Sequence, residues 1–284
     1  MIASKRPSGA SARIQRAGQW TARVVVVLAA WAGERLEDAA MWAVNLVRDL
    51  PLRVGRLLAT GWGLACDLLS LLPGTVWALA RQGPGAALDW ARARAGRSGR
   101  RLGTLALQAL DLVGLPEAFT FCWHLVTRAS PLTGPEIAAV ASALGPAALR
   151  YQDVRVAEGG VLRLIFRLNG GRAFTTFHTV NLPASGYAAR SSLDILLHEL
   201  VHVYQHERVG SLYLAQCLHA QATTGYSYGG PEGLAAALAA GKHYRDFNRE
   251  QQAQIVQDYY LLLRHGLDVS AYEPFIAEMR AGKF

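Results

Sequence analysis

The aromatic residues divide this chain into two regions of different chemistry, and the division limits the folds it can adopt. All seven Trp precede residue 130, and all ten Tyr follow it. The charges divide at the same place: residues 1–130 hold 16 basic and 8 acidic side chains, whereas residues 131–284 hold 13 of each. The Pro and Gly residues between 130 and 135 are of the kind that ends a helix. We therefore predict two domains, 1–130 and 131–284.

The first region has the composition of a helical one. It is rich in Ala, Leu, Val and Arg, which are good helix formers apart from Val. Trp20, Trp31 and Trp42 recur every 11 residues, close to three helical turns, and would therefore lie on one face of a helix. Pro and Gly are expected to break the region into several helices, at Pro51, at Pro73-Gly74, at 83–85, at 96–99 and at Pro116.

Two interpretations of this region remain open. In the first, interfacial helices anchor an apolar face through Trp while Arg side chains meet anionic headgroups or another acidic surface. The arginines concerned are Arg13, Arg16, Arg23, Arg35 and Arg48. In the second, the helices form a bundle with Trp in its core and Arg in solvent.

Two other roles for the first region are not favoured. The apolar run at 24–32 is shorter than the ~20 residues that a membrane-spanning helix needs. The longer run at 57–80 contains Asp67 and the Pro73-Gly74 pair. The Arg-rich stretch at 92–101 has no interleaved aromatic residues and no base-reading motif, so no nucleic acid is expected as a partner.

From residue 131 the pattern changes to short elements of both kinds. We predict a helix over 135–144 and then a β-hairpin, with strands at 160–168 and 173–182 and a turn at 169–172. A longer helix follows, from a capping box formed by Ser191 and Asp194 to about Arg208, and Gly210 ends it. The predicted fold is therefore of the α+β class, with an all-α region before a compact domain built from a hairpin and helices.

The longer helix contains the sequence His198-Glu199-Leu200-Val201-His202. Two His four positions apart lie on one face of a helix, where both imidazoles can reach one metal ion. Glu199 follows the first His directly and is placed to take a proton from a metal-bound water. The surrounding positions are apolar, and buried ionisable side chains are costly unless they bind something. The pattern therefore predicts a zinc site of the zincin type with Glu199 as the catalytic base.

A catalytic zinc site with one open position needs a third protein ligand. His206 is about 12 Å along the helix axis from the first His, too far to share the ion. The ligand must come from a later segment, in which the candidates are His219, Glu232, His243, Asp246 and Glu250. We favour Glu250, because Asn248 and Gln251 predict a capped helix start there and the small Ala253 permits close approach.

Several separated blocks of this region resemble the Vgr-related zinc metallopeptidases, small HExxH domains found near bacterial contractile-injection and polymorphic-toxin systems. The blocks are 131–137, 180–183, 198–205, Tyr213, the pair Tyr226 and Tyr228, and 250–260. The resemblance covers about residues 131–265 and does not reach the first 130. It implies a compact zincin fold and one zinc ion per chain, held by His198, His202 and Glu250.

Motif and resemblance together predict a zinc metallopeptidase that hydrolyses a peptide or protein substrate with a zinc-bound water activated by Glu199. The candidates for stabilising the oxyanion are Tyr226, Tyr228 and His243. Zincins with a Glu ligand often carry Asp four residues later, a position that is Gln254 here. We expect Gln254 to support the ligands, with Asp194, one turn before the first His, or Asp258 as substitutes.

The alternative is a catalytically inactive, zinc-stabilised adaptor or structural domain of a bacterial secretion or toxin system. In both cases we expect residues 1–130 to bind an anionic membrane surface or a protein partner. The sequence carries no clear targeting signal, which leaves the bacterial cytoplasm and an exported or membrane-peripheral effector both open as locations.

Overall fold

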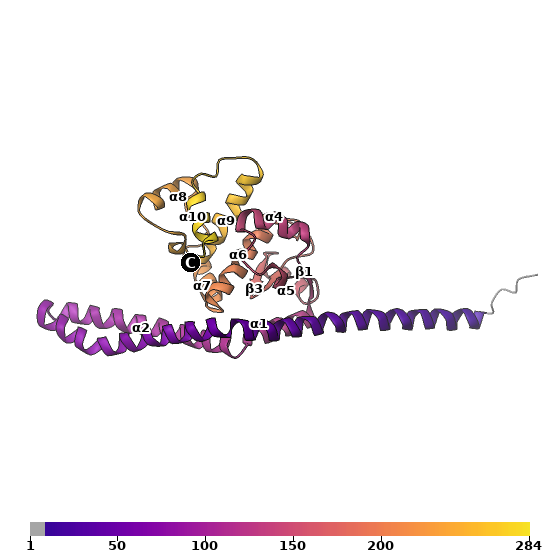
Figure 1. The fold of residues 1–284 in the computed structure, drawn as a ribbon, viewed down its shortest axis with the longest axis horizontal. Helices are drawn as coiled ribbons and strands as arrows, with labels where there is room; N and C mark the ends of the chain where they lie inside the picture. Colours follow the sequence, from indigo (N-terminus) through magenta and orange to yellow (C-terminus); the bar gives the residue numbers. More distant parts are fainter. Residues whose placement is uncertain (1–8) are drawn as a thin grey trace, which may run out of the picture.

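The longest element of the computed structural model is a single helix, α1, which runs from Gly9 to Gln82 (Figure 1). The structure describes the backbone of residues 9–284 and the side chains of residues 19–284. Gly83, with a φ of 92°, reverses the chain into α2 (Pro84–Leu112), and α3 (Leu115–Val126) follows after a bend of 61°. The first region is therefore helical, as predicted.

The helices are longer than predicted, because three of the expected breaks do not occur. α1 passes through Pro51 and Pro73, and α2 passes through the glycines at 96–99. Both prolines are exposed, so water can bind the carbonyl that each ring leaves without a donor. A Gly inside a helix costs only about 1 kcal/mol. The expected breaks next to Pro84 and Pro116 are confirmed, and both residues lie in first helical turns, where no N–H is needed.

The Trp side chains do not form the core of a helical bundle in the described part of the chain. Trp20 and Trp31 are exposed, whereas Arg35 and Arg53 are buried. The bundle interpretation, with Trp inside and Arg in solvent, is therefore wrong. The first interpretation also placed Arg13 and Arg16 against headgroups, but their side chains lie outside the described residues.

The remainder of the chain builds a small mixed sheet covered by helices. Its strands are β1 (Arg128–Pro131), β2 (Arg155–Glu158), β3 (Phe174–Thr176) and β4 (Thr179–Asn181). They lie in the order β1-β2-β4-β3, with β2 and β4 parallel and the other pairs antiparallel. The α+β class is thus confirmed, and β3 forms one edge of the sheet.

The segment 160–168 is a helix, not the first strand of a hairpin. α5 (Leu162–Asn169) buries Leu162 and Phe166, which are four positions apart and therefore on one helical face. The run Gly160 to Leu168 is apolar at helical as well as alternating positions, and the helical set is the one that packs. Gly170 ends the helix in the left-handed conformation.

The hairpin lies entirely within the segment predicted as its second strand. β3 and β4 are joined by a turn at Phe177 and His178, where Phe177 has a φ of 56°. The Phe177 N–H donates to the hydroxyl of Tyr213 at 2.8 Å, which holds this unusual backbone conformation in place.

Two helices carry the centre of the core, α6 (Leu193–Val209) and α9 (Arg249–Arg264). Leu196 and Leu200 of α6 and Ile255 and Val256 of α9 belong to one cluster and have no exposed surface. The other elements around them are α4 (Gly134–Leu144), η1 (Tyr151–Asp153), α7 (Leu212–Ala222), α8 (Gly230–Ala239), η2 (Tyr244–Asp246) and α10 (Glu273–Arg280).

In residues 131–284 the predicted helix ends are confirmed with one exception. α6 ends before Gly210, and the Asn248–Gln251 capping box opens α9, with Gln251 N–H donating to the Asn248 side chain at 2.8 Å. The predicted Ser191 capping box is wrong, because α6 begins after Ser192 without a side-chain cap.

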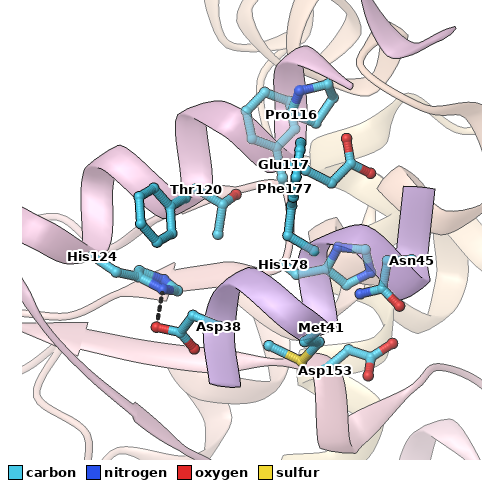
Figure 2. A pocket seen from close by; sticks show the side chains of 12 residues that line it. Asp38, Met41, Asn45, Pro116, Glu117, Thr120, His124, Asp153, Phe177 and His178 are labelled. Atoms are coloured by element: carbon cyan, nitrogen blue, oxygen red, sulfur yellow. Dashed lines mark hydrogen bonds and ion pairs between the residues drawn. The ribbon is translucent and has the colours of Figure 1, made fainter. Parts of the chain in front are cut away.

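Polar contacts join α1 to α3 and to the rest of the chain from residue 128 on, which we call the sheet domain (Figure 2). Asp38 of α1 points to His124 of α3, with 3.1 Å between their side-chain atoms. Further along α1, Asp49 accepts a bond of 2.7 Å from Arg150 of the domain. The cavity between these elements is about 30 Å³, room for roughly two water molecules. This junction is therefore a packed polar contact and not a cleft.

A substitution at Gly74 tests how closely α1 and α2 pack. A Cβ at Gly74 would overlap the Trp90 indole, whereas a Cβ at Gly55 on the same helix would meet no atom within 4 Å. We expect Gly74→Ala to destabilise the protein by about 1–3 kcal/mol and Gly55→Ala to stabilise it by up to about 1 kcal/mol. Urea unfolding of both full-length variants measures the difference, and equal effects would contradict this packing.

Candidate metal centre

Three side chains from α6 and α9 converge in the core of the domain. His198 and His202 lie one turn apart on α6, with ring centroids separated by 5.1 Å. Glu250 reaches them from the first turn of α9, and its Oε2 lies 3.5 Å from Nε2 of each His. One ligand atom from each of the three lies within 4.8 Å of the others, and all three residues are buried. This arrangement can hold a metal ion.

Two glutamines fix the tautomers of the histidines. Gln257 donates to the carboxylate of Asp194 at 3.1 Å, so its amide nitrogen faces that acceptor and its oxygen faces His198 Nδ1 at 3.0 Å. Gln205 donates in the same way to the carbonyl of Arg249 at 2.9 Å, and its oxygen lies 2.9 Å from His202 Nδ1. Because each amide oxygen can only accept, the proton of each neutral imidazole is on Nδ1. The Nε2 lone pairs then face Glu250.

The third side chain is incompletely satisfied without a cation. Gln221 donates to Oε1 of Glu250 at 2.8 Å, whereas Oε2 is buried and has no hydrogen-bond partner among the described residues. Burial alone would raise the pKa of Glu250, but His198 and His202 hold this pKa well below its usual range. The carboxylate is therefore ionised, and its free oxygen needs either a proton on one of the two Nε2 atoms or a cation between them.

A proton and a metal ion compete for the same position. Burial opposes the charged form of His202, but Cys217 and the Glu250 carboxylate together raise its pKa well above the usual value. A proton on Nε2 is one way to neutralise the buried carboxylate, and a cation bound by all three groups is the other.

Glu199 lies beside the group of three without joining it. The hydroxyl of Thr175 on β3 donates to its carboxylate at 2.7 Å and to its backbone carbonyl at 3.0 Å. Glu199 is also buried, and the carboxylate is held by a side chain from the edge strand of the sheet. It therefore has a fixed position next to the first His.

The group opens to the surface through two adjoining hollows. One has a volume of about 510 Å³ and reaches from the loop around Gly171 to α9, and the other, of about 210 Å³, lies between β3 and α7. Both are lined by His198, Glu199 and Tyr226. A molecule in the smaller hollow therefore meets all three metal-binding side chains and Glu199, whereas one in the larger hollow meets His198 and Glu199.

The structure brings together some of the predicted site residues and separates others. The ring of Tyr226 lies 5.9 Å from that of His198, on the wall of both hollows. Tyr228 instead contacts Asp258 and Tyr272, and His243 pairs with Glu278. The remaining candidates for the third ligand are not part of the group of three. They are His219, Glu232 and Asp246.

The hydrogen-bond partners of the histidines are residues that the sequence analysis did not name. Gln254 donates to Asp258 at 2.8 Å and borders the larger hollow, while Asp194 reaches His198 only through Gln257. A signal for Gln257 exists, since it lies seven residues after Glu250 and therefore on the same face of α9.

Comparison with family models, with curated proteins and with solved structures gives no match. The resemblance to the Vgr-related metallopeptidases stays a prediction, and the buried His198, His202 and Glu250 group is the observation consistent with it.

Removing the amide of Gln257 tests how the metal ligands are held. We expect Gln257→Leu to weaken zinc binding about 10- to 100-fold, since the Nδ1 proton of His198 loses its acceptor and the ring loses its orientation. The matched control is Gln254→Leu on the same helix, which touches neither His and should bind zinc like the parent. Competition against a chromophoric chelator measures both affinities, and an equal loss in the two variants would contradict this role for Gln257.

Proposed function

We propose that the chain is a zinc metallopeptidase. The observation that carries the proposal is the buried Oε2 of Glu250, which has no partner among the described residues and faces two imidazole nitrogens. Two neutral imidazoles and one carboxylate are a donor set that suits zinc in catalytic sites. The hollows beside the group supply the access that a substrate needs.

The residues around the site have separate roles in this proposal. Zinc bound by His198, His202 and Glu250 would polarise a peptide carbonyl and lower the pKa of a bound water to about 7. Glu199 would take one proton from the water as its oxygen attacks the peptide carbonyl, and would pass that proton to the amine as the C–N bond breaks. The Thr175 hydroxyl keeps the Glu199 carboxylate in one orientation through the two steps.

Tyr226 is the best placed of the three predicted oxyanion donors. It is about 40% exposed and borders both hollows, and burial with the nearby Glu250 raises the pKa of its hydroxyl. A neutral hydroxyl can donate to the developing negative charge. Tyr228 and His243 are less suited because their polar atoms already have carboxylate partners.

The edge of β3 supports a peptide as the substrate. β3 is an edge strand and also lines the smaller hollow, so an extended peptide can pair with it beside Glu199. The Tyr213 hydroxyl already donates to the carbonyl of Thr175 at 3.1 Å and accepts from the N–H of Phe177. Because Tyr213 of α7 takes these two backbone groups, a substrate cannot pair with them at that end of β3.

The alternative, a zinc-stabilised structural domain, would need a closed site with four protein ligands. Among the described residues, only three side chains offer atoms to the position. Cys217 lies near but on the other side of the ring, with its Sγ 3.5 Å from His202 Nδ1. The geometry therefore favours a site with an open position.

Metal content tests the ligand assignment. Purified full-length protein is expected to bind about one zinc ion per chain, and His202→Ala and Glu250→Ala are expected to lose it because each removes one of three donors. Glu232→Gln alters an exposed carboxylate that was also a candidate ligand, and it should retain the metal. Zinc retained by the Glu250 variant would remove α9 from the site.

Glu199→Gln tests the catalytic step separately from metal binding. The variant should retain zinc but lose about 10²- to 10⁴-fold in peptide hydrolysis, because the amide cannot accept the proton. Hydrolysis of a quenched-fluorescent peptide library measures the loss, with Glu232→Gln as the control. An inactive parent that binds zinc would support the adaptor alternative, and full activity of Glu199→Gln would exclude the proposed mechanism.

A further inference from the structure

One face of α1 is apolar along most of its length. Stepping three or four residues at a time from Leu36 to Ala80 gives 13 positions on a single line, which we call the apolar line. Its members are Leu36, Ala40, Val44, Val47, Pro51, Val54, Leu58, Trp62, Ala65, Leu69, Leu72, Val76 and Ala80. All are exposed except Ala65, which is partly buried. The line is roughly 66 Å long at 1.5 Å per residue.

The opposite face of the same helix is packed against the rest of the protein and includes buried charged and polar side chains. Arg35, Asp38, Asn45, Arg53 and Asp67 each expose 8% or less of their surface. The first four lie under the sheet domain and α3, and the last lies under α2. α1 therefore buries charged side chains while it exposes an apolar line, whereas a surface helix of a water-soluble protein packs its apolar face and exposes its charged one.

The ion pairs on the buried face show that this polarity is built into the contacts of α1. Asp67 pairs with Arg94, Arg97 and Arg101 of α2, and Arg53 pairs with Glu117 of α3. Turning α1 about its axis to bury the apolar line would break these pairs. The contacts with α2, α3 and the domain thus hold α1 in an orientation that leaves the apolar line exposed on the surface of the molecule.

We propose that α1 lies along an anionic lipid surface, with the apolar line in the headgroup and acyl boundary and with α2 and the sheet domain on the water side. An 18-residue window within Gln19–Gln82 has a mean hydropathy of 1.5, and only 11% of it is buried inside the protein. Large contiguous apolar patches are rare on the surfaces of monomeric soluble proteins and mark interaction sites. Trp62, with 73% of its surface exposed, is the type of residue that anchors helices at such a boundary.

Charge favours an anionic lipid surface as the occupant. The positive charge lies before the apolar line, since residues 1–34 hold five basic side chains and one acidic one, whereas residues 36–80 hold three basic and four acidic ones. Two copies aligned in parallel along their apolar lines would bring two of these basic segments together, which is unfavourable. Anionic headgroups attract such a segment by about 1 kcal/mol for each basic side chain near the surface.

The neighbour of α1 favours a helix that lies on the membrane over one that crosses it. Gly74 lies against Trp90, and Asp67 pairs with Arg94, so α2 accompanies the most apolar part of α1. α2 exposes three charged side chains there, Asp89, Arg92 and Arg100. If this part of α1 crossed a bilayer, α2 would carry these charges into the hydrocarbon, which is costly.

Flotation of the full-length protein with vesicles tests the proposal. The probe is a vesicle of phosphatidylcholine with phosphatidylglycerol, compared with phosphatidylcholine alone. The variant is the triple substitution Leu58→Asp, Leu69→Asp and Leu72→Asp on the apolar line. The control places the same change at three leucines of the sheet domain that are 78%, 50% and 57% exposed, Leu168→Asp, Leu238→Asp and Leu267→Asp.

The parent and the control should float with the anionic vesicles and bind the neutral ones more weakly. The triple variant should lose on the order of 100-fold in partitioning, because three leucines no longer leave water. Its thermal unfolding and zinc content should match those of the control, which separates lost binding from lost folding. Quenching of Trp emission by brominated lipid should occur in the parent and fall in Trp62→Phe.

Two results would overturn the proposal. The first is a parent that does not float with anionic vesicles, and the second is a triple variant that floats as well as the parent. A vesicle-free dimer that the triple variant dissociates, together with no flotation, would assign the apolar line to a second copy of the chain. Loss of zinc or of hydrolysis in the metal-site variants His202→Ala, Glu250→Ala and Glu199→Gln does not bear on this question, because the apolar line and the metal centre share no residue.

Discussion

The contact between α6 and α9 is the constraint on which the domain depends, because its polar atoms do not satisfy one another. Glu250 brings an ionised oxygen to two imidazole nitrogens whose protons are held on the far side by Gln205 and Gln257. Two helices that meet in this way carry a buried charge that needs either a proton or a cation. Apolar residues of the same two helices, such as Leu200 and Ile255, belong to the core cluster of the domain.

The sheet borders this contact on one side, where β3 packs against α6, and a hollow remains between β3 and α7. β3 places Thr175 against the Glu199 carboxylate, and the turn after it is held by Tyr213 from α7. α7 in turn supplies Gln221 to the second oxygen of Glu250. The edge strand, the base and the third ligand are therefore linked through one short helix, so a displacement of α7 would disturb all of them. The hollows lie where these elements leave a gap.

The sequence was sufficient for the parts of the site that depend on spacing within one helix. Two His four residues apart must share a face, and the prediction of their proximity is confirmed. The partners of their Nδ1 atoms could not be named, because Gln257 reaches His198 across a helix pair whose rotation only the packed core sets. The strand predicted at 160–168 was wrong for a related reason. Its apolar residues fit two periods, and the choice was made by the packing of Leu162 and Phe166 in a cluster that includes residues outside the segment.

The surroundings of the aromatic rings give a physical reason why Tyr falls in the second region of the chain and Trp in the first. Tyr hydroxyls in the domain reach acceptors inside the core, as Tyr204 does at the carbonyl of Met279 and Tyr244 does at that of Gln252. A Tyr is buried at low cost only where such an acceptor exists, and the domain supplies them through its short elements. α1 and α2 are regular helices whose carbonyls are already bonded, so they offer few. Trp62 and Trp77 of α1 are exposed, with no acceptor required in the protein. For Trp62 and Trp77 the surroundings thus differ from the acceptor-rich core around the Tyr, because these rings lie on the outer side of α1, whereas Trp90 packs against Gly74 between α1 and α2.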